Sequence, residues 1–366
     1  MVKNIALSSL LLCLLSGALT GQLLHAQEAA SGFDLCATLT AELIASKELT
    51  EAPRSGSPVI LASRSVVYPT WKISENWSVT GALQLATRPY YFEELSSTGY
   101  GLKGNVLQST LNYARVSDRG SLLVRAGEMS TAFGSFILHY DDADNALVDL
   151  PTGYGYYYAP VSVLGVAGAQ VDVTRGKVDA RAQFANSSPA NPRSLFARDQ
   201  YGNWAGGAGY TIRQGLRVGV SAFRGPYLSR DYKYFFPGEA NPNTLPAHAF
   251  GVDVNWAHGH TNLQGEWQTF VMRYAAVPVF RQSLGYGELK QVLSPRWYLA
   301  MRGGYSSANE GGKTQTLETA AGFRPDRIQL IKLGHEYKHY TTGDQRNDNV
   351  LAIQFITTLH RAISRR

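Results

Sequence analysis

The chain has 366 residues and a formal net charge of +6, with 36 glycines, 21 tyrosines and only 17% charged residues. This modest charge comes without a long basic run, so no nucleic-acid partner is expected. Beyond the N-terminal region no stretch of about 18 apolar residues occurs, which excludes transmembrane helices. Abundant glycine and aromatic residues at low charge are typical of strands with one face toward lipid.

Residues 1–26 have the pattern of a secretory signal peptide. Lys3 precedes the apolar run IALSSLLLCLLSGALTG, and Leu24 and Ala26 flank His25 as at a signal-peptidase site. The run is shorter than the ~20 residues of a spanning helix. We therefore expect export and cleavage after Ala26, which leaves residues 27–366 as one domain and Cys36 as its single cysteine.

Apolar and polar residues alternate with period two almost everywhere after residue 60. In the segment KVDARAQFAN, residues 177–186, the apolar side chains share one face and the charged and amide side chains share the other. Segments 216–223, 250–256 and 317–324 divide in the same way. Each such strand has one face suited to hydrocarbon and one suited to water.

The connections between these strands alternate in length. Tight turns are expected at 117–120, 175–177, 213–215, 257–260, 294–296 and 324–327. Longer segments fall at 88–104, 129–162, 187–202, 225–246 and 341–348, with shorter ones near 273–278 and 305–313. Short turns on one side and long loops on the other are the wiring of outer-membrane barrels.

Counting strands between the connections gives fifteen after residue 60, ending with NVLAIQFITTLH at 349–360. An even number requires one more, which FDLCATLTAELI at 33–44 supplies. The prediction is an all-β, transmembrane antiparallel β-barrel of about sixteen strands, wide enough for a water-filled channel. In strand 279–292, Glu288 and Lys290 fall in phase with Leu284 and Tyr286, so we expect a bulge there.

A soluble β-sandwich or propeller is the competing all-β architecture. Strands of ~10 to 12 residues, the length that a tilted strand needs to cross a bilayer, favour the barrel. The six tryptophans favour it as well, because most lie within a few residues of a turn, as in an interfacial aromatic girdle. They are Trp71, Trp77, Trp204, Trp256, Trp267 and Trp297.

The segment from 129 to 162 contains HYDDADN at 139–145 and GYGYYYAP at 153–160. It is too apolar to be a solvated external loop, so we expect it to fold into the barrel and narrow the lumen. It is the third long external segment in chain order.

These features together resemble the trimeric general porins of Gram-negative outer membranes. The glycine- and tyrosine-rich composition is similar to that of the phosphate-selective porin O/P group. The resemblance covers almost all of residues 27–366 at the level of architecture. It implies an outer-membrane location, a homotrimer, and passive diffusion of small hydrophilic solutes or ions without a cofactor. The ending HRAISRR departs from the terminal aromatic residue at which porins commonly stop.

The resemblance makes the barrel interior the candidate site. The acidic residues of the expected constriction loop are Asp141, Asp142, Asp144 and Asp149. The face assignments place ten basic residues on the lumen wall: Arg88, Arg125, Arg181, Arg213, Arg217, Arg281, Arg302, Arg324, Lys332 and Lys338. Charges of opposite sign across a narrow gap create a transverse field, and the basic excess predicts mild anion selectivity. The loop aspartates could instead pin the loop to wall arginines, and both roles stay open.

The tyrosines Tyr154, Tyr156, Tyr157 and Tyr158 fit an upper aromatic girdle better than a stacking surface for sugars in the pore. The spacing of Asp142 and Asp144 lacks the glycine and distal glutamate of a calcium loop, so no metal is expected.

Two functional alternatives remain. One is a solute-specific porin for a sugar or phosphate. The other is a barrel-type outer-membrane hydrolase, which is disfavoured because no G-x-S-x-G or H-E-x-x-H motif occurs; no catalytic residue is therefore assigned.

Overall fold

A computed structural model describes residues 31–51, 57–95, 100–154, 161, 165–186, 202–226, 246–273, 278–309, 312–341 and 347–364. The predicted signal peptide lies outside the described residues. No helix in these ranges is long and apolar enough to cross a membrane.

The described residues form sixteen strands and three short helices. The strands are β1 Gly32–Ser46, β2 Val59–Lys72, β3 Trp77–Arg88, β4 Gly101–Ser117, β5 Gly120–Met129, β6 Val166–Arg175, β7 Val178–Ala185, β8 Asn203–Arg213, β9 Leu216–Pro226, β10 Pro246–His258, β11 Thr261–Met272, β12 Phe280–Val292, β13 Trp297–Ala308, β14 Gly312–Phe323, β15 Gln329–Tyr340 and β16 Asp348–Ser364. The helices are α3 Glu48–Glu51, η2 Phe92–Glu94 and η3 Phe136–His139.

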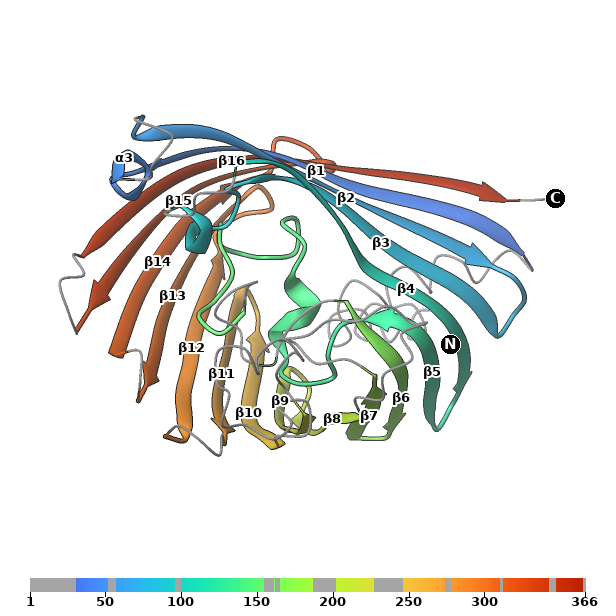
Figure 1. Ribbon diagram of the computed structural model, residues 1–366. Coiled ribbons are helices and arrows are strands. Elements are labelled where there is room, and N and C mark those ends of the chain that lie inside the picture. Colours follow the sequence, from blue (N-terminus) through green and yellow to red (C-terminus); the bar gives the residue numbers. More distant parts are fainter. Residues whose placement is uncertain are drawn as a thin grey trace.

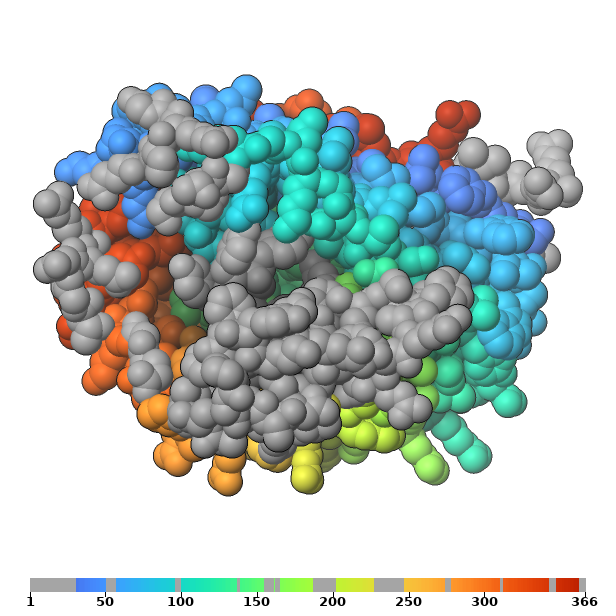
Figure 2. Space-filling view, in the orientation of Figure 1, coloured from blue at the N-terminus to red at the C-terminus, as the bar shows by residue number. Residues whose placement is uncertain are grey.

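Each strand pairs antiparallel with its sequence neighbours, and β1 pairs with β16 to close the barrel (Figure 1). The closing register runs from Gly32 opposite Ser364 to Ser46 opposite Val350. In the space-filling view, blue N-terminal and red C-terminal atoms lie side by side along this seam (Figure 2). Closure pairs every strand on both sides and leaves no open edge. The predicted antiparallel barrel of about sixteen strands and its first strand are confirmed.

The connections alternate as the sequence predicts. At one end of the barrel the described strands are joined by short turns at 73–76, 118–119, 176–177, 214–215, 259–260, 293–296 and 324–328. The connections at the other end include the long segments 130–165, 186–202 and 227–245. The ends of β1 and β16 at Gly32 and Ser364 lie at the short-turn end.

Alternate residues of each strand divide into an exposed apolar set and a buried, more polar set. On β14, Leu317 is 45% exposed and its neighbour Glu318 is 2% exposed. On β7, Val178 and Phe184 are exposed while Gln183 is buried. In a closed barrel the exposed set forms the outer surface, so the outside is apolar and the inside carries the polar groups.

Most tryptophans lie on the outer surface near strand ends. Trp71, Trp77 and Trp297 flank the short turns, and Trp204 stands at the long-loop end of β8. Trp267 differs, because it lies in the middle of β11 and stacks on Tyr305 with ring centroids 5.8 Å apart.

The described part of the C-terminal tail, up to Ser364, belongs to the last strand. The sequence analysis ended that strand at His360, whereas β16 continues to Ser364. The extension exists because β1 begins early enough to pair with it, as Phe33 opposite Ile363 and Asp34 opposite Ala362 show.

Candidate functional site: the barrel interior and the β5–β6 segment

The described residues 130–154, which follow β5, contact inward-facing side chains on several strands; we call these residues the β5–β6 segment. Its first residues, 130–134, form hydrogen bonds with side chains of β7. Gln183 donates to the Ser130 carbonyl at 2.9 Å and accepts from the Ala132 N–H at 3.0 Å. Arg181, on the same face of β7, donates to the carbonyl oxygen of Gly134.

The segment is then held to β11 by one carboxylate. Glu266 accepts hydrogen bonds from the Ser135 N–H at 3.0 Å, the Ser135 hydroxyl at 2.9 Å and the Tyr154 hydroxyl at 2.5 Å. The N–H of Phe136 also donates to the Tyr154 hydroxyl, at 3.2 Å. Glu266 and Tyr154 therefore fasten together the start and the end of a twenty-residue stretch.

This placement corrects the interpretation of Tyr154 as part of an outer aromatic girdle. Its ring is 6% exposed and faces inward, because its hydroxyl has a buried carboxylate partner there. Tyr156, Tyr157 and Tyr158 lie outside the described residues.

The same region explains the irregular pattern of β12. Leu284, Tyr286 and Glu288 all face inward and are 1%, 8% and 5% exposed. Phe136 packs on Tyr286 with ring centroids 5.7 Å apart, and Gly153 lies against Leu284. The register of β12 with β11 and β13 is continuous, so the predicted bulge is wrong. Apolar residues face inward there because the β5–β6 segment covers them.

Asp142 joins the β5–β6 segment to the opposite part of the wall. Its carboxylate forms an ion pair with Arg64 of β2 at 3.0 Å. It also accepts from the Thr40 hydroxyl of β1 at 2.7 Å and from the Tyr90 hydroxyl at 2.8 Å. Arg64 is 1% exposed and lies against the rings of Tyr90 and Tyr91. The carboxylate is thus buried and surrounded by donors.

The other loop acids differ in their surroundings. Asp141 accepts from the Tyr68 hydroxyl of β2 and is 5% exposed. Asp149 accepts from the Phe92 N–H at 3.2 Å and is 8% exposed. Asp144, in contrast, is exposed. Three of the four predicted acids are held in contacts, and Asp144 is open to water.

Two buried cations bind residues 142–149 of the segment. Lys332 of β15, with 0% exposure, donates to the carbonyl oxygens of Asp142 at 2.6 Å and Leu147 at 2.8 Å. Arg302 of β13 donates to the Asp149 carbonyl oxygen at 2.9 Å and to Asn145 at 3.0 Å.

Carboxylates of the wall complete this network. Arg302 forms ion pairs with Glu288 of β12 at 2.7 Å and Glu318 of β14 at 2.8 Å. Glu318 also accepts from the N–H groups of Val148 and Asp149, both at 3.0 Å. Every charge in the network thus has a partner, which a buried ion pair needs to offset the cost of desolvation.

A second charged group lies on β5 to β10. Arg125 pairs with Asp172 at 2.9 Å, and Arg217 pairs with both Asp179 and Asp253 at 2.6 Å. The side chains of Arg217 and Asp179 are 17% and 37% exposed, so water reaches them. We call these five residues the β5–β10 charge ladder.

The structure places most predicted basic wall residues on the inner face. Inward-facing positions are held by Arg88, Arg125, Arg181, Arg217, Arg302, Lys332 and Lys338. Arg324 directly follows β14 and is partly buried, and Arg213 is exposed at the end of β8, next to a register shift. Arg281 was placed wrongly: it is out of phase with inward-facing Leu284 and Tyr286 and lies on the outer face.

Among the described residues, Arg64 and Lys290 are inward-facing cations that the sequence analysis missed. Arg64 lies on β2, where both faces are rich in apolar residues, so hydropathy gave no contrast between them. Its period-two spacing from Tyr68 and Thr70 was the available signal. Lys290 was missed because the alternation in β12 did not show which face of the strand points inward. Its ammonium lies 4.6 Å from the centre of the Tyr298 ring.

Comparison with known proteins gives matches at the level of structure. No protein-family model and no curated protein sequence matches the chain. Solved structures do. The outer membrane protein OmpT of Vibrio cholerae, in a trimer form, matches with a TM-score of 0.57 at 12% identity, over 90% of this chain and 100% of that one.

Two porins match equally well. An anion-selective porin from Comamonas acidovorans has a TM-score of 0.58 at 8% identity, with 90% and 100% of the two chains covered. OmpF of Salmonella typhi, solved with daunomycin, has a TM-score of 0.58 at 11% identity, with 90% and 98% covered. The chain therefore has the sixteen-stranded fold found in outer-membrane porins.

Proposed function

We propose that this protein forms a channel in a bacterial outer membrane and passes small hydrophilic solutes by passive diffusion. The observation that carries the proposal is the division of the closed barrel into an apolar outside and a charged inside. Sixteen strands enclose a lumen wide enough for water. Short turns at one end with long connections at the other are the pattern of outer-membrane barrels.

The β5–β6 segment acts in this proposal as the constriction of the channel. Its contacts run from Gln183 and Glu266 to Arg64 and then back to Lys332, so it crosses between separate parts of the wall. Because the anchors are buried and charged, the segment keeps its position. Solutes would then pass beside it, along the water-accessible β5–β10 charge ladder.

Selectivity in this channel is weak and favours anions. Asp141, Asp142 and Asp149 are buried in contacts, so their charges act little on a passing ion. Asp144 is exposed, and the cations Lys290 and Arg324 lie within electrostatic range of it. In the β5–β10 charge ladder, three carboxylates face two arginines, which weakens the preference for anions. A small basic excess near Asp144 then sets the preference.

Export and assembly follow from the same proposal. Residues 1–26 would direct secretion and be removed, and residues 27–366 would form the barrel in outer-membrane lipid. The trimer form of the Vibrio cholerae relative in fold supports a homotrimer here.

A solute-specific channel for a sugar or phosphate is the second candidate. Arg125, Arg181 and Arg217 stand on alternate strands of one wall, which is a suitable arrangement for a phosphate. Phosphate that blocks the chloride current at low concentration would favour this candidate over a general channel.

Planar-bilayer recording of the purified, folded protein tests the proposal. We expect step-like conductance increases that scale with salt concentration, and heat-unfolded protein serves as the control. An absence of steps from protein that is folded and inserted would refute the channel.

A further inference from the structure

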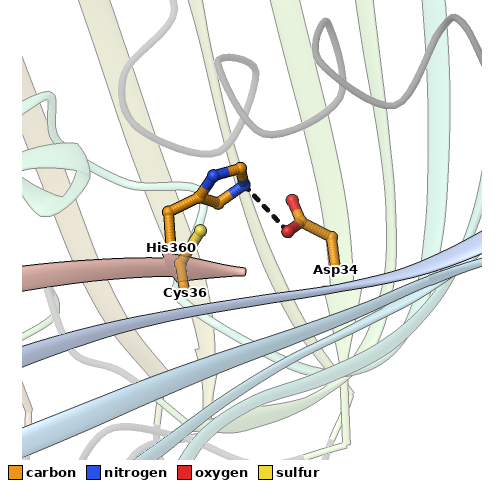
Figure 3. A group of neighbouring side chains, drawn as sticks. All are labelled: Asp34, Cys36 and His360. Atoms are coloured by element: carbon orange, nitrogen blue, oxygen red, sulfur yellow. Dashed lines mark ion pairs between the residues drawn. The ribbon is translucent and has the colours of Figure 1, made fainter. Parts of the chain in front are cut away.

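Three metal-ligating side chains meet on the inner face of the β1–β16 seam. Asp34 and Cys36 are two residues apart on β1 and point to the same side, and His360 of β16 lies directly opposite Cys36. A carboxylate oxygen, the Cys36 sulfur and an imidazole nitrogen all lie within 4.8 Å of one another. Figure 3 shows the His360 ring turned toward the Asp34 carboxylate, with the Cys36 sulfur beside it.

The cluster lies near the short-turn end of the barrel. Asp34 is opposite Thr70 of β2, close to the turn that follows Lys72. Cys36 packs against the apolar cluster that contains Tyr68, whereas the His360 side chain is 49% exposed. One side of the group is therefore apolar and closed, and the other is open to water from the lumen.

One buried oxygen of this cluster has an ion-pair partner but no aligned hydrogen-bond donor among the described residues. The Asp34 Oδ1 atom is 2.8 Å from His360 Nε2. It is nevertheless buried and accepts no hydrogen bond from the part of the chain that the structure describes. Buried carboxylate oxygens nearly always have a hydrogen-bond partner. A cation bound between the carboxylate, the imidazole and the thiolate would satisfy this oxygen.

The donor set selects a class of cation. Ca²⁺ and Mg²⁺ prefer oxygen ligands alone, so a thiolate and an imidazole do not suit them. Zn²⁺ binds sulfur, nitrogen and carboxylate oxygen together, at about 2.0 to 2.3 Å from each. Ligand atoms within 4.8 Å of one another reach such a centre with small side-chain rotations. The open side leaves room for water as a fourth ligand.

We propose that Asp34, Cys36 and His360 bind one borderline-soft divalent cation, with Zn²⁺ as the first choice. Binding displaces the thiol proton of Cys36 to solvent and joins the first strand of the barrel to the last. Because the barrel closes through the pairing of β1 with β16, the bound cation stabilises the closed form over any form with a parted seam.

Cobalt binding tests the proposal, since Co²⁺ bound to a thiolate has a near-ultraviolet charge-transfer band. The folded protein of residues 27–366, in which Cys36 is the single cysteine, is reduced with a phosphine, held in detergent and titrated with Co²⁺. We expect the band to saturate at one ion per chain, to disappear on addition of Zn²⁺, and to be absent from Cys36→Ser. His360→Gln should weaken binding by at least the roughly 10- to 100-fold that loss of an outer-shell partner costs elsewhere.

His258→Gln is the matched control, because His258 is exposed at the turn between β10 and β11. Its affinity should equal that of the parent protein. Gel mobility of unheated samples, measured without metal, confirms that each variant forms a barrel. No thiolate band from the folded parent protein, or equal affinity of the His360→Gln and His258→Gln variants, would overturn the proposal.

Discussion

Arg64 of β2 and Asp142 of the β5–β6 segment form an ion pair at 3.0 Å, with side chains only 1% and 6% exposed. A second donor of the same guanidinium, Nε, bonds to Gln84 of β3 at 2.8 Å and so fixes its orientation. Water cannot replace either partner at such burial without a large cost. The pair therefore determines where the middle of the segment lies.

Asp142→Asn should destabilise the barrel strongly. The change leaves the Arg64 charge buried without its counter-ion, which costs about 3 to 5 kcal/mol. We expect a lower midpoint of thermal unfolding in detergent and a noisier current, because the segment loses its central anchor. Combining Asp142→Asn with Arg64→Gln should restore part of the stability, since no lone charge remains.

Asp144→Asn is the matched control for that experiment, because Asp144 is exposed. Its unfolding midpoint should equal that of the parent protein. Equal midpoints for the Asp142→Asn and Asp144→Asn variants would show that the ion pair does not hold the segment.

Ion selectivity, in contrast to stability, should depend on Asp144. Asp144→Asn removes an exposed negative charge and should shift the reversal potential in a salt gradient toward anions, without loss of stability. Lys290→Gln removes a nearby cation and should shift it toward cations. The shifts should shrink as ionic strength rises, because salt screens exposed charges. If neither variant moves the reversal potential, these charges do not border the ion path.

The sequence predicts the barrel well because lipid demands an apolar outside. On β7 and β14 the inner face is charged, so alternation alone assigns each face correctly. The same rule fails on β12, since Leu284 and Tyr286 face inward against the β5–β6 segment. Period two identifies a strand there, but it cannot say which apolar face meets lipid and which meets protein.

The partners of the loop acids are harder to predict than the acids themselves. HYDDADN marks the segment, but Arg64, Tyr68 and Tyr90 approach it from residues about 50 to 80 positions earlier in the chain. Only the closed barrel brings β2 to this point. Whether an aspartate pins a loop or faces the lumen therefore depends on contacts that no local pattern contains.

Comparison of Gly153→Ala with a control glycine variant should separate the cost of a steric clash from the cost of backbone strain. Gly153 has φ +98°, and an added Cβ would lie 2.2 Å from Leu284 Cδ1. Left-handed strain alone costs about 1 kcal/mol or somewhat more. Gly176→Ala is the control, because Gly176 also has a positive φ, +59°, but nothing lies within 4 Å of its added Cβ.

The difference between the two variants in thermal unfolding then measures the contact of the β5–β6 segment with β12. Adding Leu284→Ala to Gly153→Ala should remove the clash and recover part of the loss. Equal destabilisation by Gly153→Ala and Gly176→Ala would mean that the segment moves away from β12 at no cost.

Helix α3 should open more readily as pH rises. The Glu48 N–H donates to the Ser46 hydroxyl, which donates to Asp348 of β16. Burial raises the pKa of Glu48 from 4.5 to about 7, and the neighbouring Asp348 carboxylate adds to the effect while Lys338 opposes it. The native form thus binds a proton that the opened form releases. Its stability is greatest below pH 4.5, falls as pH rises toward about 7, and is level above that.

Hydrogen exchange of residues 46–51, expressed as protection factors, measures this dependence. Protection should fall across that window by at most about tenfold per pH unit, the limit for one proton. In Glu48→Gln the side chain is always neutral and isosteric, so protection of the helix should lose its dependence on Glu48 and stay high above pH 7. Because Asp348 and Glu336 are unchanged in this variant, the difference between the two profiles isolates Glu48. Identical profiles would show that its ionisation does not govern the opening of α3.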